Sequence, residues 1–277
     1  MRGARAGLLA LLFAAALARP ARAGVEVGSD TGLASQYVWR GLTLVNRPVL
    51  QPGLWASGTL GSFSATLSLW SNIEIGKYDG SSDISLSNGA HAFDWTRFAP
   101  SFEVAYALGD GAAGVAAGIA GYLYPNGNGT TAADDAAEVY GRLTLPGVLG
   151  IVPVFRAYQD VTAIDGTYLE AGLSRTFAIR DGFDFVASAA AGFNLGQSAR
   201  YDAGGNLQEP GNFAKDGLTH WELGAGLPIA WRAFTVEPSA HVIFGRDAYT
   251  KVWSATEDRD VKYWFGLTLS TTRTLLD

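Results

Sequence analysis

The chain of 277 residues contains no cysteine. It can therefore form no disulfide, no thiolate metal site and no cysteine nucleophile. The lack of thiols also suits an oxidising compartment, where a free cysteine is a reactive liability. Charged residues are scarce as well, at 17% of the chain, against roughly 25% in ordinary soluble domains.

Long apolar runs are also missing. After Leu17 no run approaches the ~18 apolar residues that a membrane-spanning helix requires. Yet 48% of the residues are hydrophobic, 12% are aromatic, and 35 are glycines. A closed β-barrel is the other structure that can span a membrane, because it pairs all of its backbone N–H and C=O groups.

The N-terminus has the three parts of a secretory signal peptide. Arg2 and Arg5 give a basic start, Gly7 to Ala18 is apolar, and Ala21-Arg22-Ala23 is a small-residue cleavage site before Gly24. We predict a signal peptide over 1–23 and a mature domain over 24–277. Cleavage removes four arginines and no acid, so the formal charge changes from −6 to −10 (16 basic against 26 acidic residues). An acidic exported chain without a basic cluster is not expected to bind nucleic acid.

The stretch Phe183–Gly196 alternates in polarity. Its odd positions are apolar, with Phe183, Phe185 and Phe193 toward the ends, whereas its even positions are small or polar. A period of two predicts a β-strand between two different environments. Aromatic residues at both ends of an apolar face are typical of a strand that faces lipid.

Eleven further segments alternate in the same way, which gives twelve predicted strands. The first runs from Val25 to about Thr43, with a bulge expected at Asp30 to Gly32. The others are 50–57, 63–70, 97–108, 115–123, 138–145, 151–160, 168–177, 183–196, 219–227, 234–245 and 261–270.

Short turns alternate with longer loops between these segments. The short turns are Gly61-Ser62, Asp110-Gly111, Pro146-Gly147, Asp181-Gly182 and Trp231-Arg232, and the longer set is 43–48, 76–94, 125–137, 164–166, 198–216 and 247–259. Outer-membrane barrels have an even number of strands, short periplasmic turns and longer extracellular loops. The sequence therefore predicts an all-β fold, a closed antiparallel transmembrane β-barrel of about 12 strands. An exported sandwich or jelly roll would also alternate, but with strands that are usually shorter.

Aromatic residues gather near the ends of the predicted strands. Toward the outer rim we expect Phe193, Trp221, Phe244, Tyr263 and Phe265; toward the inner rim we expect Tyr106, Phe177, Phe183, Phe185 and Phe234. Two such girdles border the apolar band of a membrane barrel.

The first hairpin carries a family resemblance. The run Ser35-Gln36-Tyr37-Val38-Trp39-Arg40-Gly41-Leu42-Thr43, then Pro48-Val49-Leu50-Gln51-Pro52-Gly53-Leu54, resembles the opening of the TorF-type porins of Gram-negative bacteria. Leu69-Trp70-Ser71-Asn72 is similar to a strand that follows in that family. The resemblance implies an outer-membrane β-barrel that acts as a channel, embedded in outer-membrane lipid and inserted by the outer-membrane assembly machinery. The chain departs from the usual barrel pattern in its last residues, Thr274-Leu275-Leu276-Asp277, where an aromatic residue is common.

Charged residues concentrate on the polar faces of the predicted strands. A charge on the lipid face would cost about 2–4 kcal/mol at the membrane midplane, so these faces are expected to line the lumen. The candidates for lining a pore are Arg40, Glu74, Arg97, Glu103, Glu138, Arg142, Arg156, Asp160, Glu170, Asp184, His220, Glu222, Glu237, His241 and Lys262.

Two interpretations of this charged lumen compete. In one, the residues pair with each other and fill a narrow interior; in the other, they line a pore and set its selectivity. Barrel diameter grows with strand number, and twelve strands lie between filled eight-stranded barrels and wide porins. We expect a narrow channel that passes small polar or cationic solutes, since acids outnumber bases.

Two histidines and a carboxylate form the strongest local group. If the chain turns at Trp231-Arg232, Glu222 faces His241 across the hairpin and Gly226 faces Glu237, with His220 one pleat above Glu222. A histidine–carboxylate pair can do acid–base work, and two histidines with a glutamate can bind a metal. We favour a structural pair and predict no metal site, because ion pairs in polar interiors are common.

An enzyme and a binding barrel are the alternatives to a channel. Some outer-membrane barrels hydrolyse lipids with serine and histidine on the lipid-facing side, but here His220 and His241 are predicted to point inward, His91 lies in a loop, and no G-x-S-x-G motif is present. No nucleotide, flavin or phosphate motif indicates a cofactor. The loops 76–94 and 198–216 are long enough to bind a partner, or to fold inward and narrow the pore.

Overall fold

The computed structural model describes residues 23–87, 89–109, 112–126, 135–162, 164–209, 211–245 and 261–276. Throughout these ranges the regular elements are β-strands. None of the residues described belongs to a helix long and apolar enough to cross a membrane. Residues 1–22, the Asp110-Gly111 turn and the loop 247–259 lie outside the described ranges, so the signal-peptide prediction stays a prediction.

Twelve antiparallel strands close into a barrel, as the sequence predicts. Each strand of the wall pairs with its neighbours along the chain, and β1 also pairs with β17 to complete the ring. The strands are β1 (Ala23–Ala34), β4 (Val49–Leu60), β5 (Phe63–Glu74), β6 (Asp94–Leu108), β7 (Ala113–Tyr122), β8 (Ala136–Thr144), β9 (Val152–Asp160), β10 (Thr167–Arg180), β11 (Phe183–Leu195), β14 (Gly217–Gly226) continued by β15 (Ile229–Trp231), β16 (Phe234–Gly245) and β17 (Val261–Leu276).

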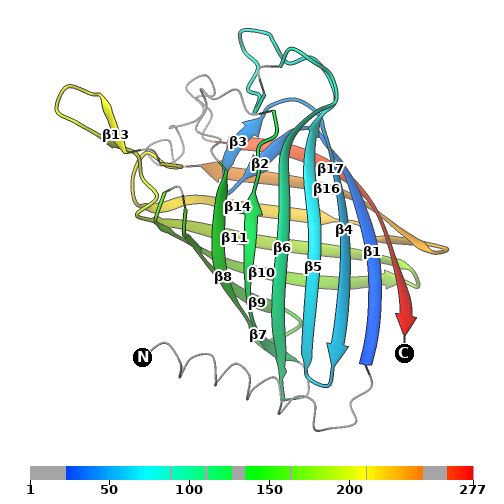
Figure 1. The fold of residues 1–277 in the computed structure, drawn as a ribbon. Coiled ribbons are helices and arrows are strands. Elements are labelled where there is room, and N and C mark those ends of the chain that lie inside the picture. The colour runs from blue at the N-terminus through cyan, green and yellow to red at the C-terminus, as the bar shows by residue number, and fades with distance from the viewer. Residues whose placement is uncertain are drawn as a thin grey trace, which may run out of the picture.

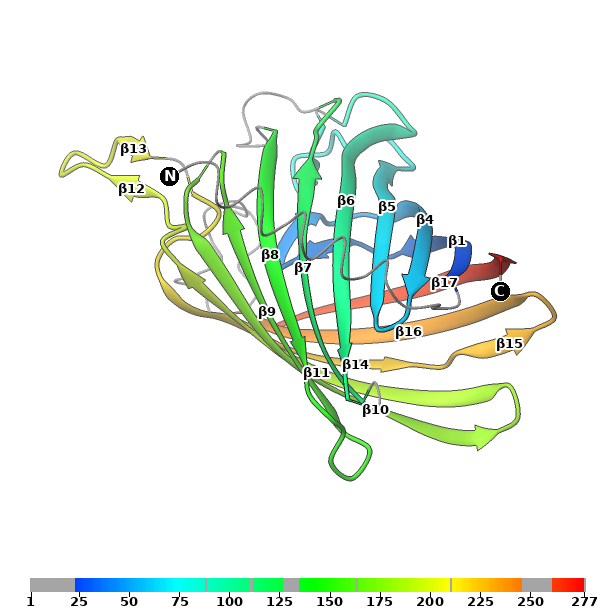
Figure 2. The same ribbon diagram turned by 60° about the horizontal axis from the view of Figure 1, so that its bottom comes forward.

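The two ends of the barrel differ (Figure 1). The short turns and the C-terminal end of β17 lie at one end, which we call the short-turn end; the long connections lie at the other, the long-loop end. A small hairpin of β12 (Arg200–Tyr201) and β13 (Leu207–Glu209) belongs to the long-loop end and projects away from the barrel in both views (Figures 1 and 2).

The apolar faces of the strands point outward. Leu54, Leu67 and Leu223 are each at least half exposed although they lie in the middle of strands, which is the arrangement that a lipid-facing band requires. The aromatic residues predicted for the outer rim are all exposed and lie near the long-loop ends of β11, β14, β16 and β17. Thr219 of β14 is buried beside the inward-facing His220, because the register between β11 and β14 shifts between Gly192 and Phe193.

Two of the predicted short turns are displaced. The turns at Gly61-Ser62 and Asp181-Gly182 are confirmed, whereas the β8–β9 connection turns at Leu149-Gly150, beyond Pro146-Gly147. Leu149 and Gly150 both have positive φ (54° and 77°), as the commonest two-residue hairpin turn demands, and a proline cannot adopt that backbone. The β15–β16 turn falls at Arg232-Ala233, since Trp231 pairs with Phe234.

The first wall strand is shorter than predicted. β1 pairs with β4 and β17 without interruption across Asp30 to Gly32, so the bulge expected there is absent, and β1 ends at Ala34 instead of continuing to Thr43. Next to this end, the Ser35 hydroxyl accepts the Phe265 N–H at 3.0 Å, and the Gln36 amide donates to the Tyr263 carbonyl at 3.0 Å. These side chains satisfy the exposed edge of β17, so the backbone can leave the wall.

Candidate functional site

The chain that leaves the wall forms a hairpin inside the barrel. Strands β2 (Tyr37–Trp39) and β3 (Leu42–Val45) pair with each other, and we call residues 37–45 the inward hairpin. The hairpin meets residues from seven strands of the wall: Trp70 of β5, Arg97 of β6, Tyr122 of β7, Glu138 of β8, Tyr158 of β9, Tyr168 of β10 and Lys262 of β17. A segment that touches seven strands of a closed barrel through their inward side chains lies in the lumen.

The tip of the inward hairpin is a tight turn at Arg40-Gly41. Arg40 has a φ of 52° and Gly41 a φ of 80°. Positive φ is uncommon for a residue with a side chain, so Arg40 is held there by its contacts. A Cβ on Gly41 would lie 2.6 Å from Cγ of His220, so only glycine allows the turn to approach β14 this closely.

Arg40 is fixed by a carboxylate and three aromatic rings. Its Nη1 and Nη2 donate to the two oxygens of Glu138 at 2.7 Å each. The guanidinium lies 4.3–4.5 Å from the ring centres of Trp39, Tyr158 and Tyr168. The pair is only 5% and 2% exposed, and the Tyr122 hydroxyl donates a further bond to Glu138 at 2.8 Å. A bidentate, fully bonded pair is the form in which a buried ion pair is stable.

A second guanidinium, that of Arg97, lies beside this pair without a carboxylate. It is 1% exposed and is surrounded by the rings of Tyr37, Trp39, Tyr122 and Tyr124, with centroids at 4.1–5.9 Å. Its Nη1 donates to the Tyr37 hydroxyl. Burial raises the pKa of that hydroxyl to about 12, so Tyr37 is neutral at physiological pH.

Long loops complete a packed core at this end of the lumen. Phe213, from the loop 198–216, is fully buried and stacks on Tyr168 with centroids 5.9 Å apart and planes at 7°. Tyr78 and Leu86, from the loop after β5, are buried against β3 and β4. Glu74 accepts the Leu86 N–H at 2.9 Å and the Ser85 hydroxyl at 2.6 Å, so it holds a loop and does not face open solvent.

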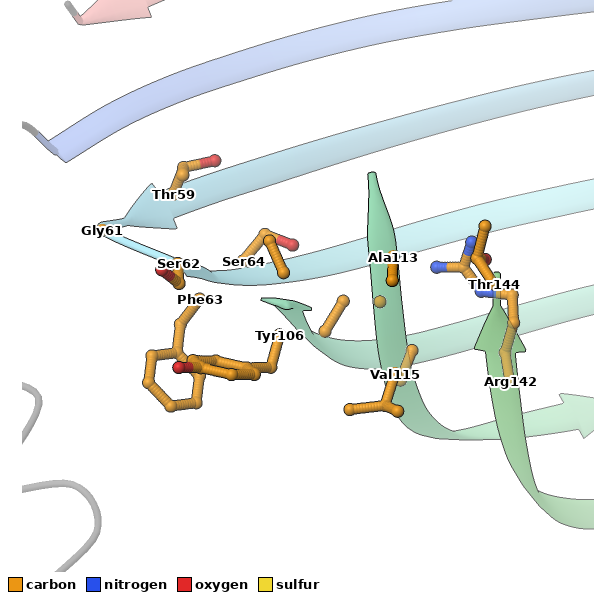
Figure 3. Close-up of a pocket in the computed structure, with 14 residues that line it drawn as sticks. Thr59, Gly61, Ser62, Phe63, Ser64, Tyr106, Ala113, Val115, Arg142 and Thr144 are labelled. Atoms are coloured by element: carbon orange, nitrogen blue, oxygen red, sulfur yellow. The ribbon is translucent and has the colours of Figure 1, made fainter. Parts of the chain in front are cut away.

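Next to this core, toward the short-turn end, the charged pairs are partly exposed. Arg142 pairs with Glu103 and Arg156 with Glu170, both at 2.5 Å, and these side chains are 22–35% exposed. A cavity of about 360 Å³ lies at this end, near the turn between β4 and β5. In Figure 3, Thr59, Ser64 and the Arg142 guanidinium lie on one side of the wall, and Phe63, Tyr106 and Val115 on the other. Polar side chains therefore line the inside here while apolar ones face outward.

The two histidines do not converge on one site. His241 Nδ1 lies 2.7 Å from Glu222 Oε1, so the predicted pair is confirmed. The predicted register is wrong by two residues: His241 faces Gly224, Glu222 faces Ile243, and Gly226 faces Ser239. Because the shift is even, the same residues still point inward. His220 instead bonds to the Thr219 hydroxyl at 2.9 Å, and the described residues contain no cluster of three or more metal-ligating side chains.

The other residues predicted to line a pore lie at separate positions in the barrel. Lys262 Nζ donates to the Gly41 carbonyl at 3.3 Å, and Asp160 accepts the Thr162 N–H at 2.8 Å. Glu237 lies over Gly226, where a Cβ would be 2.5 Å from its Oε1. Asp184 lies at the short-turn end, in the second position of β11.

Sequence reasoning missed the aromatic residues around Arg40. Trp39, Tyr122, Tyr158 and Tyr168 are on inward faces, whereas the aromatics were sought on the lipid side. A basic residue followed by glycine, in the middle of a strand that is too long for the barrel wall, is the signal that could have revealed the turn at Arg40-Gly41.

Comparison with known proteins places the chain by its fold. No family model matches it, and no curated protein matches it. An outer membrane channel from Pseudomonas putida F1 has a TM-score of 0.52 at 10% identity, over 92% of this chain and 97% of that one. The NanC porin (TM-score 0.49, 13% identity, 88% and 98% covered) and LpxR from Salmonella typhimurium (0.47, 10%, 88% and 99%) are also similar. The chain thus has the fold of an outer-membrane β-barrel.

Proposed function

We propose that the protein is a porin-like channel of the bacterial outer membrane, which passes small polar solutes and is narrowed by the inward hairpin. The observation that carries this proposal is the contrast along the lumen. The Arg40–Glu138 pair is almost fully buried, whereas the Glu103–Arg142 and Glu170–Arg156 pairs are partly exposed. Charges that remain solvated inside a barrel are typical of a water-filled path.

Other observations support the same proposal. The fold is shared with an outer membrane channel. Residues 37–43, within the first stretch that resembles the TorF-type porins, lie in the inward hairpin. With the predicted signal peptide, this supports export, insertion by the outer-membrane assembly machinery, and an orientation with the long loops outside. Family membership and location remain proposals.

The charge at the hairpin bears on selectivity. The excess of acids over bases along the lumen predicts a preference for cations. Around the inward hairpin, however, Arg40 pairs with Glu138, whereas the contacts of Arg97 among the described residues are a tyrosine hydroxyl and aromatic rings. Since the most constricted part of a path sets its selectivity, we propose that anions are preferred there.

Single-channel conductance in planar bilayers tests the proposal. We expect small, discrete steps for the wild type and larger steps when residues 37–45 are replaced by a short Gly-Ser linker. Heat-dependent gel mobility would establish that both barrels are folded. If both fold and neither conducts, the channel proposal is wrong.

A binding barrel is the second candidate. The projecting β12–β13 hairpin carries exposed Tyr201 and Leu207, which could contact a partner outside the membrane. If the protein has this role, it should not conduct ions in bilayers. Deletion of residues 200–209 should then weaken the binding of the partner.

We propose no enzymatic role. The His241–Glu222 pair points into the lumen and His241 stacks on Trp264 at 3.7 Å, away from lipid. A phospholipase or deacylase assay that is positive for the wild type and negative for His241→Ala would contradict this.

A further inference from the structure

The outward faces of the wall strands carry few charges, and these charges have one sign. Among the described residues they are Arg175 in β10, Arg180 at the end of that strand and Arg273 near the end of β17. Arg180 shares this face because the register shifts before it and sets it opposite the outward Phe183. No acid of the described wall strands lies on an outward face, and all three arginines lie toward the short-turn end. A surface that has only cations at one end of a barrel attracts anionic groups there.

Arg175 lies within the apolar outward face of β10, and not at its end. Leu173 precedes it on this face, Phe177 and Ile179 follow it, and all of these side chains are exposed. A charge on a lipid-facing strand is most costly at the membrane midplane and costs little near the interface. The position is therefore stable where the guanidinium reaches the polar layer of the membrane.

The side chain of Arg175 extends toward the short-turn end. Its guanidinium carbon lies 4.6 Å from the ring centre of Phe177, which is two residues further along β10 in that direction. Its Nε lies 3.6 Å from the place that a Cβ on Gly150 would take, so the side chain passes beside the turn between β8 and β9. Long basic side chains extend in this way along apolar surface and bring their charge to the membrane interface. Phe177 is one of the aromatic residues expected at the inner rim, where rings lie at the level of the lipid headgroups.

The guanidinium of Arg175 has no carboxylate partner among the described residues. It forms no ion pair and no hydrogen bond with any of them. The ring of Phe177 contacts one face of the guanidinium, so the N–H groups in its plane are left to bond to another molecule. Because Arg175 is exposed, a ligand from outside the barrel can reach these donors.

The turn between β8 and β9 places apolar side chains next to this cation. Val148 and Leu149 are 70% and 83% exposed, and Ile151 is partly exposed. Exposed apolar side chains beside an unpaired cation match a molecule that has both an anionic group and an apolar part. A membrane lipid is such a molecule, and the outward face of the barrel lies against it.

We propose that Arg175 binds the phosphate of a phospholipid in the membrane leaflet at the short-turn end, with the acyl chains along Leu173. A phosphate diester presents two oxygens that match two N–H groups of a guanidinium, so it satisfies the donors that the protein leaves unbonded. This site is on the outer surface of the barrel and does not depend on conductance. A barrel that conducts without binding lipid would keep the channel and remove the site, and a barrel that binds lipid without conducting would do the reverse.

Native mass spectrometry of the full-length barrel in a neutral detergent tests the site, because it counts bound molecules. The probes are dioctanoyl phosphatidylglycerol, dioctanoylglycerol, which lacks the phosphate, and inorganic phosphate. We expect saturable binding of phosphatidylglycerol and at least tenfold weaker binding of the other two. Equal binding of dioctanoylglycerol would show that the acyl chains alone are bound, and equal binding of inorganic phosphate would show that any anion is accepted. Either result would overturn the proposal.

Substitutions of Arg175 locate the bound phosphate. Arg175→Gln should weaken phosphatidylglycerol binding at least fivefold, and Arg175→Lys should lie between, since lysine keeps the charge but lacks the planar fork. Arg200→Gln, at an exposed arginine of the β12–β13 hairpin, is the matched control at the other end of the barrel and should bind as the wild type. Heat-dependent gel mobility would establish that each variant is folded.

Two further results would contradict the site. Unchanged binding of phosphatidylglycerol by folded Arg175→Gln would do so. A lipid-free dimer of the wild type that Arg175→Gln dissociates would assign Arg175 to a contact between subunits instead. If Arg175→Gln does not fold, the comparison of phosphatidylglycerol with dioctanoylglycerol on the wild type decides the question.

Discussion

Arg40 and Glu138 are 98 positions apart in the sequence and are joined inside the barrel by two hydrogen bonds of 2.7 Å. One residue is the tip of the inward hairpin and the other belongs to the wall strand β8. The pair fastens the hairpin across the lumen.

Removing the carboxylate should release the hairpin. Glu138→Gln leaves Arg40 as a buried cation without a counter-ion, which typically destabilises a fold by about 3–5 kcal/mol. The barrel wall keeps its other pairings, so we expect larger or more frequent conductance steps together with a lower unfolding free energy. Bilayer recordings and denaturant unfolding measure the two effects. Glu103→Gln, in a partly exposed pair, is the control and should change stability by about 1 kcal/mol or less.

Gly41, at the tip of the inward hairpin, is expected to be required for the hairpin to pack against β14. Gly41→Ala places a Cβ 2.6 Å from the His220 ring at a φ of 80°, which strains the turn and pushes it from β14. We expect increased conductance with little change in the mobility of the folded barrel. Gly58→Ala is the matched change, since a Cβ there would meet nothing within 4 Å. Identical recordings for the two variants would refute a constriction at this turn.

The loop 198–216 should depend on a single aromatic anchor. Phe213 is fully buried and stacks on Tyr168, and truncation of a buried phenylalanine commonly costs about 3–5 kcal/mol. Phe213→Ala should therefore detach the loop and make it much more sensitive to added protease. Tyr201→Ala, at an exposed position of the same loop, should leave the digestion pattern unchanged. A resistant loop in Phe213→Ala would mean that other contacts hold it.

The orientation of the strands can be tested on one strand. Leu67 faces outward and Thr66, its neighbour, faces inward beside Glu103. Leu67→Arg should lower the unfolding free energy in lipid bilayers by about 2–4 kcal/mol, because it places a charge in the apolar band. Thr66→Arg should have a much smaller effect, since a carboxylate lies opposite. Equal costs would argue against a membrane-facing exterior.

Signal-peptide cleavage gives a direct chemical prediction. The mature protein isolated from outer membranes should begin at Gly24, which N-terminal sequencing would show. Ala23→Tyr should retain the leader because the cleavage site needs small residues, whereas Ala14→Leu, which keeps the middle apolar, should be cleaved normally. Detection of Met1 or Arg2 on the wild-type membrane protein would disprove the prediction.

The sequence by itself determined the barrel and the two faces of its wall. Lipid accepts only apolar side chains on the outward face, so a period of two appears in every spanning strand whatever its partners are. For this reason Phe193 and Trp221 could be placed outside, and Glu222 and His241 inside, before any pairing was known. The contact between His241 and Glu222 was predicted correctly although the predicted register was wrong by two residues, because an even shift keeps each side chain on the same face of the sheet.

Only the tertiary structure decided where the first strand ends and what fills the lumen. Tyr37 and Trp39 alternate with their neighbours as a wall strand would, because a hairpin inside the barrel has the same period as a strand of the wall. What separates the two is contact with distant residues: Glu138 for Arg40, and Arg97 for Tyr37. Those contacts arise only when the ring has closed, so no local pattern in residues 35–45 could reveal them.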